Sequence, residues 1–223
     1  LPGVEEIGKA RRAASEALRI RPNMNKALNL RGFIHFEARE LTAALGDFEK
    51  ARRRDPQNVE ILLNLGSALN ELQRFDESLE VFEKALKLHS GNFELRQSLA
   101  VLLMQLGRFS DARTQFRAIL QVDPTNIGAV SSLIEIGDPR DHSQLEALAR
   151  KLLKSKNLNE EDRAGLEIGL GNQMMREGDV DEAVKLITSS NARRAKSRPY
   201  DPSEAESWFH KTLDLFPADR HAG

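Results

Sequence analysis

Small, aromatic and proline residues recur along the chain at a fixed spacing of 34 residues. Each set has the same order, which is small, small, aromatic, small and proline, with a few exchanges among the members. The three sets are Gly32, Ala44, Phe48, Ala51 and Pro56; then Gly66, Ser78, Phe82, Ala85 and Ser90; then Ala100, Ala112, Phe116, Ile119 and Pro124. A fixed period of this length predicts a chain built by stacking one structural unit several times.

The residue types within one set fit a hairpin of two packed helices. Gly32 lies on the first helix, where the second helix must approach closely, and Ala44 is a small counterpart on that second helix. Phe48 is expected to fill the space between consecutive hairpins, and Pro56 ends the second helix because proline cannot continue it. This order resembles the tetratricopeptide repeat, a helix-turn-helix hairpin. The resemblance implies an all-α fold, a right-handed superhelical solenoid of such hairpins.

The repeat register divides the whole chain into segments. The predicted segments are a partial repeat with only its second helix at 1–24; full repeats at 25–58, 59–92 and 93–126; a degenerate hairpin at 127–156; a repeat-like hairpin at 157–192; and a basic linker with an aromatic helix at 193–223. The degenerate hairpin is interrupted at 136–139, where Gly137 and Pro139 break the helical pattern. Because residues 1–24 supply only a second helix, we expect the chain to start inside a repeat.

Two residues depart from the repeat pattern in the regular part of the chain. Arg31 occupies a position that is usually aliphatic, and Ser90 replaces the final proline of the second repeat. Gly91 follows directly, and glycine is the residue most often found just past a helix end. We therefore expect Gly91 to serve as the C-cap of that helix.

Composition and charge exclude several classes of function. The chain has no cysteine, which excludes a disulfide framework, a thiolate zinc site and a cysteine nucleophile. Its net charge of −1 gives no reason to expect a nucleic-acid or membrane partner. The five histidines are scattered without metal-ligand spacing, so no metal site is expected; they are His35, His89, His142, His210 and His221. No apolar run is long enough to cross a bilayer, and a bacterial cytoplasmic location is the expectation.

The resemblance implies that the first helices line a concave face. The side chains expected to point into it mix amide, hydroxyl and apolar groups, which suits an extended peptide. They are Lys26, Asn29, Phe33, Phe36, Asn64, Ser67, Asn70, Gln97, Ser98, Val101 and Met104. The basic two-carboxylate clamp of chaperone-binding repeats occurs only in fragments, which disfavours a chaperone C-terminus as partner. The alternative is that these side chains are only the polar lining of a solenoid.

A second resemblance covers residues 130–217. The ordered segments are GDPRDHSQLEALARKLL, NEEDRAGLEIGLGNQMMREGDVDEA, a basic Asn-Ala-Arg-Arg, YDPSEAE and a helix closing in LDLFP. This order is similar to the neck of bacterial tetratricopeptide-repeat sulfotransferases, in which a catalytic domain follows the repeats. That family binds the sulfate donor PAPS with a glycine-, serine- and threonine-rich phosphate loop. This sequence has no such loop, so we expect no enzyme activity, no catalytic residue and no cofactor in these 223 residues.

The segment after residue 192 separates the two functional hypotheses. One hypothesis is a protein-interaction scaffold that forms the N-terminal part of a sulfotransferase. In that case Trp208, Phe209, Leu213 and Phe216 pack on a missing catalytic domain. The alternative is a stand-alone adaptor or assembly protein, in which these side chains cap the last hairpin. The basic cluster Arg193, Arg194, Lys196 and Arg198 is expected to be solvated surface or an interdomain contact, because no aromatic stacking platform accompanies it.

Overall fold

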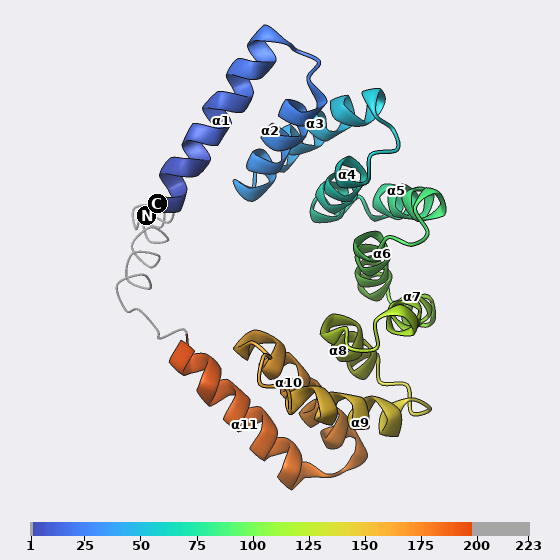
Figure 1. Ribbon diagram of the computed structural model, residues 1–223. Helices are drawn as coiled ribbons and strands as arrows, with labels where there is room; N and C mark the ends of the chain where they lie inside the picture. Colours follow the sequence, from blue (N-terminus) through green and yellow to red (C-terminus); the bar gives the residue numbers. More distant parts are fainter. Residues whose placement is uncertain (1, 198–223) are drawn as a thin grey trace, which may run out of the picture. The chain divides into compact units, whose positions relative to one another are not determined.

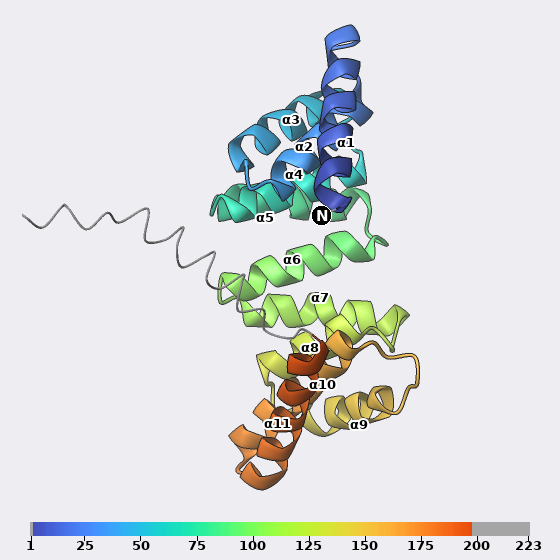
Figure 2. The same cartoon turned by 90° about the vertical axis from the view of Figure 1, so that its left-hand side faces the viewer.

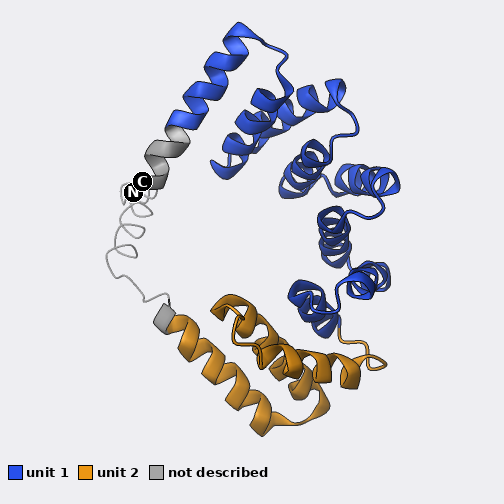
Figure 3. Cartoon of the chain, viewed as in Figure 1, with its two compact units in different colours: residues 1–136 blue, residues 137–223 orange. Residues whose placement is uncertain are grey.

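The computed structural model describes the backbone of residues 2–197 and the side chains of residues 9–195. All regular structure within residues 2–197 is helical, which confirms the all-α prediction for this part of the chain. The chain divides into two compact units, residues 1–136 and residues 137–223, which are coloured separately in Figure 3. No helix among the described residues is both long and apolar enough to cross a membrane.

Unit 1 is a stack of helical hairpins. Its helices are α1 (Pro2–Ile20), α2 (Asn25–Glu37), α3 (Leu41–Arg54), α4 (Val59–Glu71), α5 (Phe75–Leu88), α6 (Phe93–Gln105), α7 (Phe109–Val122) and α8 (Ile127–Ile136). The pairs α2 and α3, α4 and α5, and α6 and α7 each pack against one another as a hairpin. Figures 1 and 2 show α2, α4 and α6 in one layer and α3, α5 and α7 in the other. We call these the inner and outer layers of unit 1.

The recurring phenylalanines form the core of the hairpins. Phe48, Phe82 and Phe116 are 0%, 2% and 0% exposed. The sequence pattern placed these rings between consecutive hairpins, whereas the structure shows that two of them pack within their own hairpin. A Cβ added to Gly32 would lie 2.6 Å from Phe48 Cε1, and one added to Gly66 would lie 2.4 Å from Phe82 Cε1. The glycines therefore provide the room that the rings of their own hairpins occupy.

The turns and helix starts of unit 1 also follow the repeat. Arg39, Gln73 and Gly107 have positive φ angles of 61°, 58° and 71° at the turns within the three hairpins. Asn58 and Asn92 cap the next helices, because their side chains accept hydrogen bonds from Ile61 N (3.2 Å) and Leu95 N (2.8 Å). Neither the positive φ angles nor the asparagine caps were expected from the sequence, although the positions of both recur every 34 residues.

The expectation that Gly91 caps α5 is wrong. The helix ends at Leu88, and His89 is the C-cap residue, with its N–H donating to Ala85 O at 2.9 Å. Gly91 does not have a positive φ angle. The His89 ring nitrogen Nε2 also lies 2.8 Å from Gln57 O, in the loop after α3. His89 thus ends the helix earlier and ties it to the preceding hairpin, which leaves Ser90 and Gly91 in the connecting turn.

The unusual Arg31 is explained by a partner on the facing helix. Its Nε and Nη2 donate to the two carboxylate oxygens of Asp47 at 2.6 and 2.7 Å, and Asp47 is only 3% exposed. This bidentate bond raises the pKa of Arg31 above its ordinary value. The equivalent residues one repeat later are Leu65 and Val81, both buried. An ion pair between α2 and α3 therefore replaces an apolar pair between α4 and α5.

Unit 2 contains three described helices, α9 (His142–Leu153), α10 (Glu160–Glu177) and α11 (Val180–Ser197). Asn159 caps α10 by accepting a hydrogen bond from Asp162 N at 2.8 Å, and Gly178 ends it with a φ of 92°. The close contact between α10 and α11 forms at Gly171, where an added Cβ would lie 2.6 Å from Ile187 Cγ1. Helix α11 continues through residues 193–197, where the sequence led us to expect the start of a linker.

Candidate functional site

The inner layer of unit 1 carries a hollow of about 460 Å³ between α4 and α6, bordered by the end of α2. Its lining combines hydroxyl, amide, carboxylate and apolar side chains. The lining residues are Phe36, Ser67, Asn70, Glu71, Phe82, Glu94, Gln97, Ser98 and Val101. We call this hollow the inner groove.

The structure brings six of the predicted peptide-binding residues together in the inner groove. They are Phe36, Ser67, Asn70, Gln97, Ser98 and Val101. Of the other predicted residues, Lys26 and Phe33 are exposed on α2, and Met104 is partly buried on α6. Phe33 is 47% exposed and Val101 is 39% exposed, so the inner layer presents apolar side chains to solvent.

The remaining two predicted residues contact each other across α2 and α4. Asn64 Nδ2 donates to Asn29 Oδ1 at 2.9 Å, and Asn29 Nδ2 donates to Glu60 Oε1 at 2.7 Å. Asn29 is only 6% exposed. In this structure the amides of Asn29 and Asn64 hold two inner helices together, so replacing Asn64 would also disturb the contact between repeats.

One amide acceptor in the inner groove has no partner in the protein. Asn70 Oδ1 is buried and accepts no hydrogen bond from the described residues. A buried acceptor without a partner costs free energy that a bound donor recovers. Because Asn70 Oδ1 is closed off from solvent, a ligand N–H group would reach it only after the Asn70 side chain rotates toward the groove.

Two carboxylates border the inner groove, and the sequence prediction did not include them. Glu71 Oε2 accepts from Arg39 Nη1 at 2.6 Å, in a pair whose arginine side chain is 71% exposed. Glu94 lies at the start of α6, is exposed, and makes no hydrogen bond or ion pair with the described part of the chain. The repeat register could have identified both residues, because Glu71 is 34 residues after Glu37 and Glu94 is 34 residues after Glu60.

The outer layer has a hollow of its own, of about 530 Å³, between α3 and α5. Its floor is apolar and includes Leu62 and Leu69 of α4. The charges at its rim balance, with three cationic and three anionic side chains. They are Arg52, Arg53, Lys84, Glu49, Glu77 and Glu80. We call this hollow the outer groove; unlike the inner groove, it has no excess of one charge.

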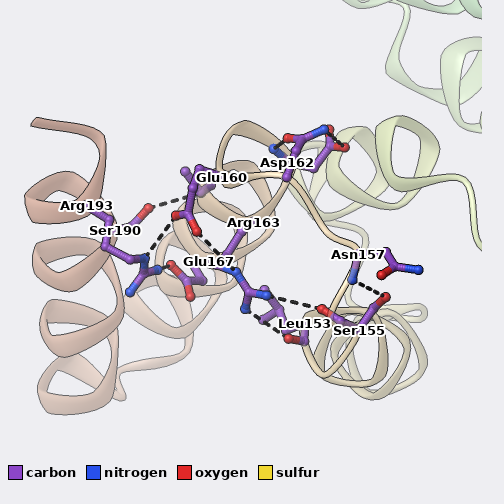
Figure 4. Close-up of polar contacts among 11 residues, drawn as sticks. Leu153, Ser155, Asn157, Glu160, Asp162, Arg163, Glu167, Ser190 and Arg193 are labelled. Carbon is purple, nitrogen blue, oxygen red and sulfur yellow. Dashed lines mark hydrogen bonds and ion pairs between the residues drawn. The ribbon is translucent and has the colours of Figure 1, made fainter. Parts of the chain in front are cut away.

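A polar cluster in unit 2 involves the predicted basic segment (Figure 4). Arg193 on α11 forms an ion pair with Glu167 of α10, and its Nε lies 3.5 Å from Glu160 Oε2. Arg163 of α10 donates to Leu153 O at 3.0 Å and to Ser155 O at 3.3 Å, at the end of α9. These contacts connect the three helices of unit 2, so Arg193 has a structural role.

Some of the predicted residues lie outside the part of the chain that the structure describes. The side chains of Lys196 and Arg198 lie outside the described residues, as do Trp208, Phe209, Leu213 and Phe216. Within the part of the chain that is described, no three His, Asp or Glu side chains are grouped so that they could hold a metal ion.

Comparison with known proteins agrees with the repeat geometry. Two family models, both described as tetratricopeptide repeat, match the chain, one at residues 4–59 and 34–93 and the other at residues 69–135. Together they span residues 4–135, which is more than half of the chain. No curated protein matches the chain.

Solved structures with the same fold have low sequence identity to this chain. MamA from Desulfovibrio magneticus RS-1, from residue 41 to its end, is 18% identical with a TM-score of 0.64, covering 79% of this chain and 97% of that one. A tetratricopeptide repeat protein from Parabacteroides merdae is 16% identical with a TM-score of 0.65, covering 92% and 77%. YrrB, a tetratricopeptide protein described as having an unusual peptide-binding site, is 14% identical with a TM-score of 0.61, covering 84% and 93%. At this identity the three structures show only that the fold is shared. The family models over residues 4–135 show that the chain belongs to the tetratricopeptide repeat proteins.

Proposed function

We propose that the chain is a protein-interaction scaffold that binds an extended peptide in the inner groove. The observation that carries this proposal is the hollow between α4 and α6, in which amides and hydroxyls lie beside exposed apolar side chains. An extended peptide offers backbone N–H and C=O groups along its length and side chains that alternate in direction. The inner groove supplies partners for both kinds of group.

The polar and apolar residues of the groove have separate roles in this proposal. The amides of Asn70 and Gln97 line the groove and can exchange hydrogen bonds with a peptide backbone; Asn70 Oδ1, which has no partner in the protein, becomes available once its side chain rotates. Phe36 and Val101 offer apolar contact area, which provides most of the binding energy at such sites. Peptide binding by a protein of this fold is also named in the description of YrrB.

The test uses peptides selected from a phage-displayed library of random sequences against the full chain. Their dissociation constants are then measured by fluorescence polarisation for the wild type and for two matched variants. Ser67→Tyr fills the inner groove, whereas Thr114→Tyr adds the same ring to an exposed position on α7 in the outer layer. We expect Ser67→Tyr to weaken binding at least about tenfold and Thr114→Tyr to change it less than about twofold. Equal affinities for all three proteins, with circular dichroism showing that each is folded, would contradict the proposal.

A finer version of the proposal concerns the parent protein. We propose that the repeats form the N-terminal part of a PAPS-dependent sulfotransferase and recruit its protein substrates. The support is the ordered resemblance over residues 130–217, whose described part runs from the second half of α8 through α11. The alternative is a stand-alone adaptor that presents the same groove without a catalytic domain.

The coding sequence beyond Gly223 and the intact mass of the native protein distinguish these alternatives. A continuation into a strand and a glycine-, serine- and threonine-rich loop would support the sulfotransferase proposal. A stop codon close to Gly223 would contradict it and leave the adaptor. Peptide binding in the inner groove is expected in either case, so the two proposals fail independently.

A further inference from the structure

We infer that the partner of the inner groove is a cationic peptide, with lysine or arginine close to apolar residues. This inference rests on the proposed peptide-binding function and adds the chemical class of the ligand. Its basis is the lining of the inner groove, which includes two carboxylates and no cationic side chain.

The 34-residue register places charged side chains in two rows across the inner helices. The row in the first turns is Lys26, Glu60 and Glu94, and the row in the last turns is Glu37, Glu71 and Gln105. The same three helices carry two further cations, Arg31 and Arg96, but these bond to Asp47 and Gln115 of the outer layer. The two rows therefore contain four carboxylates and only one cation, Lys26. A surface with an excess of one charge attracts and orients a partner of the opposite charge.

The carboxylates lie where a ligand in the inner groove would meet them. Glu71 and Glu94 both line the groove, together with Phe36 and Val101. A lysine or arginine side chain has a long apolar stem and a charged end, so it can cover an aromatic ring while its end reaches a carboxylate. Among the lining residues of the inner groove there is no cationic side chain to repel it.

The two carboxylates differ in how available they are. Glu94 has no hydrogen-bond or ion-pair partner among the described residues, so it can pair with a ligand directly. Glu71 already pairs with Arg39, but that arginine is largely exposed, and exposed ion pairs are weak. A cationic ligand can therefore displace Arg39, and removal of Arg39 should strengthen binding.

The outer groove lacks these properties and serves as an internal comparison. Its carboxylates Glu77 and Glu80 pair with Arg74 and Lys84, and cations of the rim equal its anions in number. The outer groove should therefore show no preference for a charged peptide, even though its volume is similar.

The test uses three fluorescein-labelled decapeptides that share the same leucines and serines. They carry arginine, glutamine or glutamate at the remaining three positions. We expect the full chain to bind the arginine peptide at least about tenfold more tightly than the glutamine peptide, and the glutamate peptide most weakly. The difference between the arginine and glutamine peptides should shrink as salt is raised.

Matched variants assign the preference to the inner groove. Glu71→Gln combined with Glu94→Gln should reduce the arginine preference at least about fivefold, since two exposed pairs are lost. Glu77→Gln combined with Glu80→Gln removes the same number of charges from the outer groove and should leave the preference unchanged. Arg39→Gly, which suits the positive φ at that residue, should tighten binding of the arginine peptide about twofold or more.

The outcomes separate this inference from the proposed function. If the three peptides bind equally and Ser67→Tyr weakens all of them, the groove binds peptides and the charge inference is wrong. If the outer-groove variant abolishes the arginine preference and the inner-groove variant retains it, the inference is also wrong. If no peptide of the series, including the arginine peptide, binds in a way that Ser67→Tyr weakens, both the inference and the proposed function are contradicted.

Discussion

The hairpins of unit 1 and the α10–α11 hairpin of unit 2 use the same contact with different residues. In unit 1 a glycine of the first helix receives the ring of Phe48 or Phe82 from the second helix. In unit 2 the glycine is Gly171, and the side chain against it is Ile187. The contact between a glycine and a large apolar side chain is therefore kept in both units, while the aromatic ring is not.

The two units also differ in how polar contacts support the hairpins. The regular hairpins have helices of 13 or 14 residues and few polar groups in their cores. Helices α10 and α11 each have 18 residues, and Arg193, near the end of α11, pairs with Glu167 in the middle of α10. Buried polar side chains are also more frequent in this hairpin, where Glu167, Gln173 and Ser190 are 8%, 1% and 0% exposed. We conclude that apolar contacts provide most of the stability of unit 1, whereas the stability of unit 2 depends more on polar contacts.

The strongest test of this difference is to remove the large side chain from each hairpin. Phe82→Ala should lower the free energy of unfolding by about 3–5 kcal/mol, because the ring is 2% exposed and fills the space beside Gly66. Ile187→Ala should cost less, because Ile187 is only partly buried. Urea denaturation of the full chain followed by circular dichroism measures both. A loss below about 1 kcal/mol for Phe82→Ala would contradict the assigned core.

The ion pair between Arg31 and Asp47 is the exception within unit 1. Asp47→Ala should cost about 2–3 kcal/mol, because it leaves a partly buried guanidinium without its partner. The double change Arg31→Leu with Asp47→Val copies the equivalent pair Leu65 and Val81 and should be close to neutral or stabilising. If the double variant were as unstable as Asp47→Ala, the first hairpin would need the ion pair for reasons other than packing.

The glycine contact itself can be tested with a matched pair of substitutions. Gly66→Ala should destabilise the chain by about 1–2 kcal/mol, because an added Cβ meets the Phe82 ring at 2.4 Å. Gly46→Ala, on α3 with nothing within 4 Å of the added Cβ, should instead stabilise by up to about 1 kcal/mol. Because Ala100 occupies the equivalent place beside Phe116, a neutral Gly66→Ala would show that the ring shifts easily.

The smallest expected effect concerns the turns inside the hairpins. Gln73 has a φ of 58° where the third repeat has Gly107 at 71°. Gln73→Gly should therefore stabilise by up to about 1 kcal/mol, because glycine adopts this conformation without steric cost. Thermal melts of the full chain measure the change, and a lower melting temperature would show that the Gln73 side chain contributes more than its backbone strain costs.

The sequence was sufficient to predict the all-α fold of stacked hairpins because the period fixes which residues must pack together. It also led to six residues that line the inner groove. It did not lead to Glu71 and Glu94, because a carboxylate in the first or last turn of a helix is as typical of solvated surface as of a binding site. The ion pair between Arg31 and Asp47 was also missed. Taken alone, Arg31 is an exception to the repeat pattern, and Asp47 is typical of an exposed charge on a helix. The extension of α11 was missed because a run of basic residues is typical of both a linker and a helix end.

An NMR titration of the isotopically labelled full chain with the arginine decapeptide would locate the peptide-binding surface residue by residue. Binding in the inner groove should give the largest amide chemical-shift changes at Ser67, Asn70, Gln97, Ser98 and Val101, on the inner helices α4 and α6. Changes concentrated on α3 and α5 around the outer groove, or on the helices of unit 2, would contradict it.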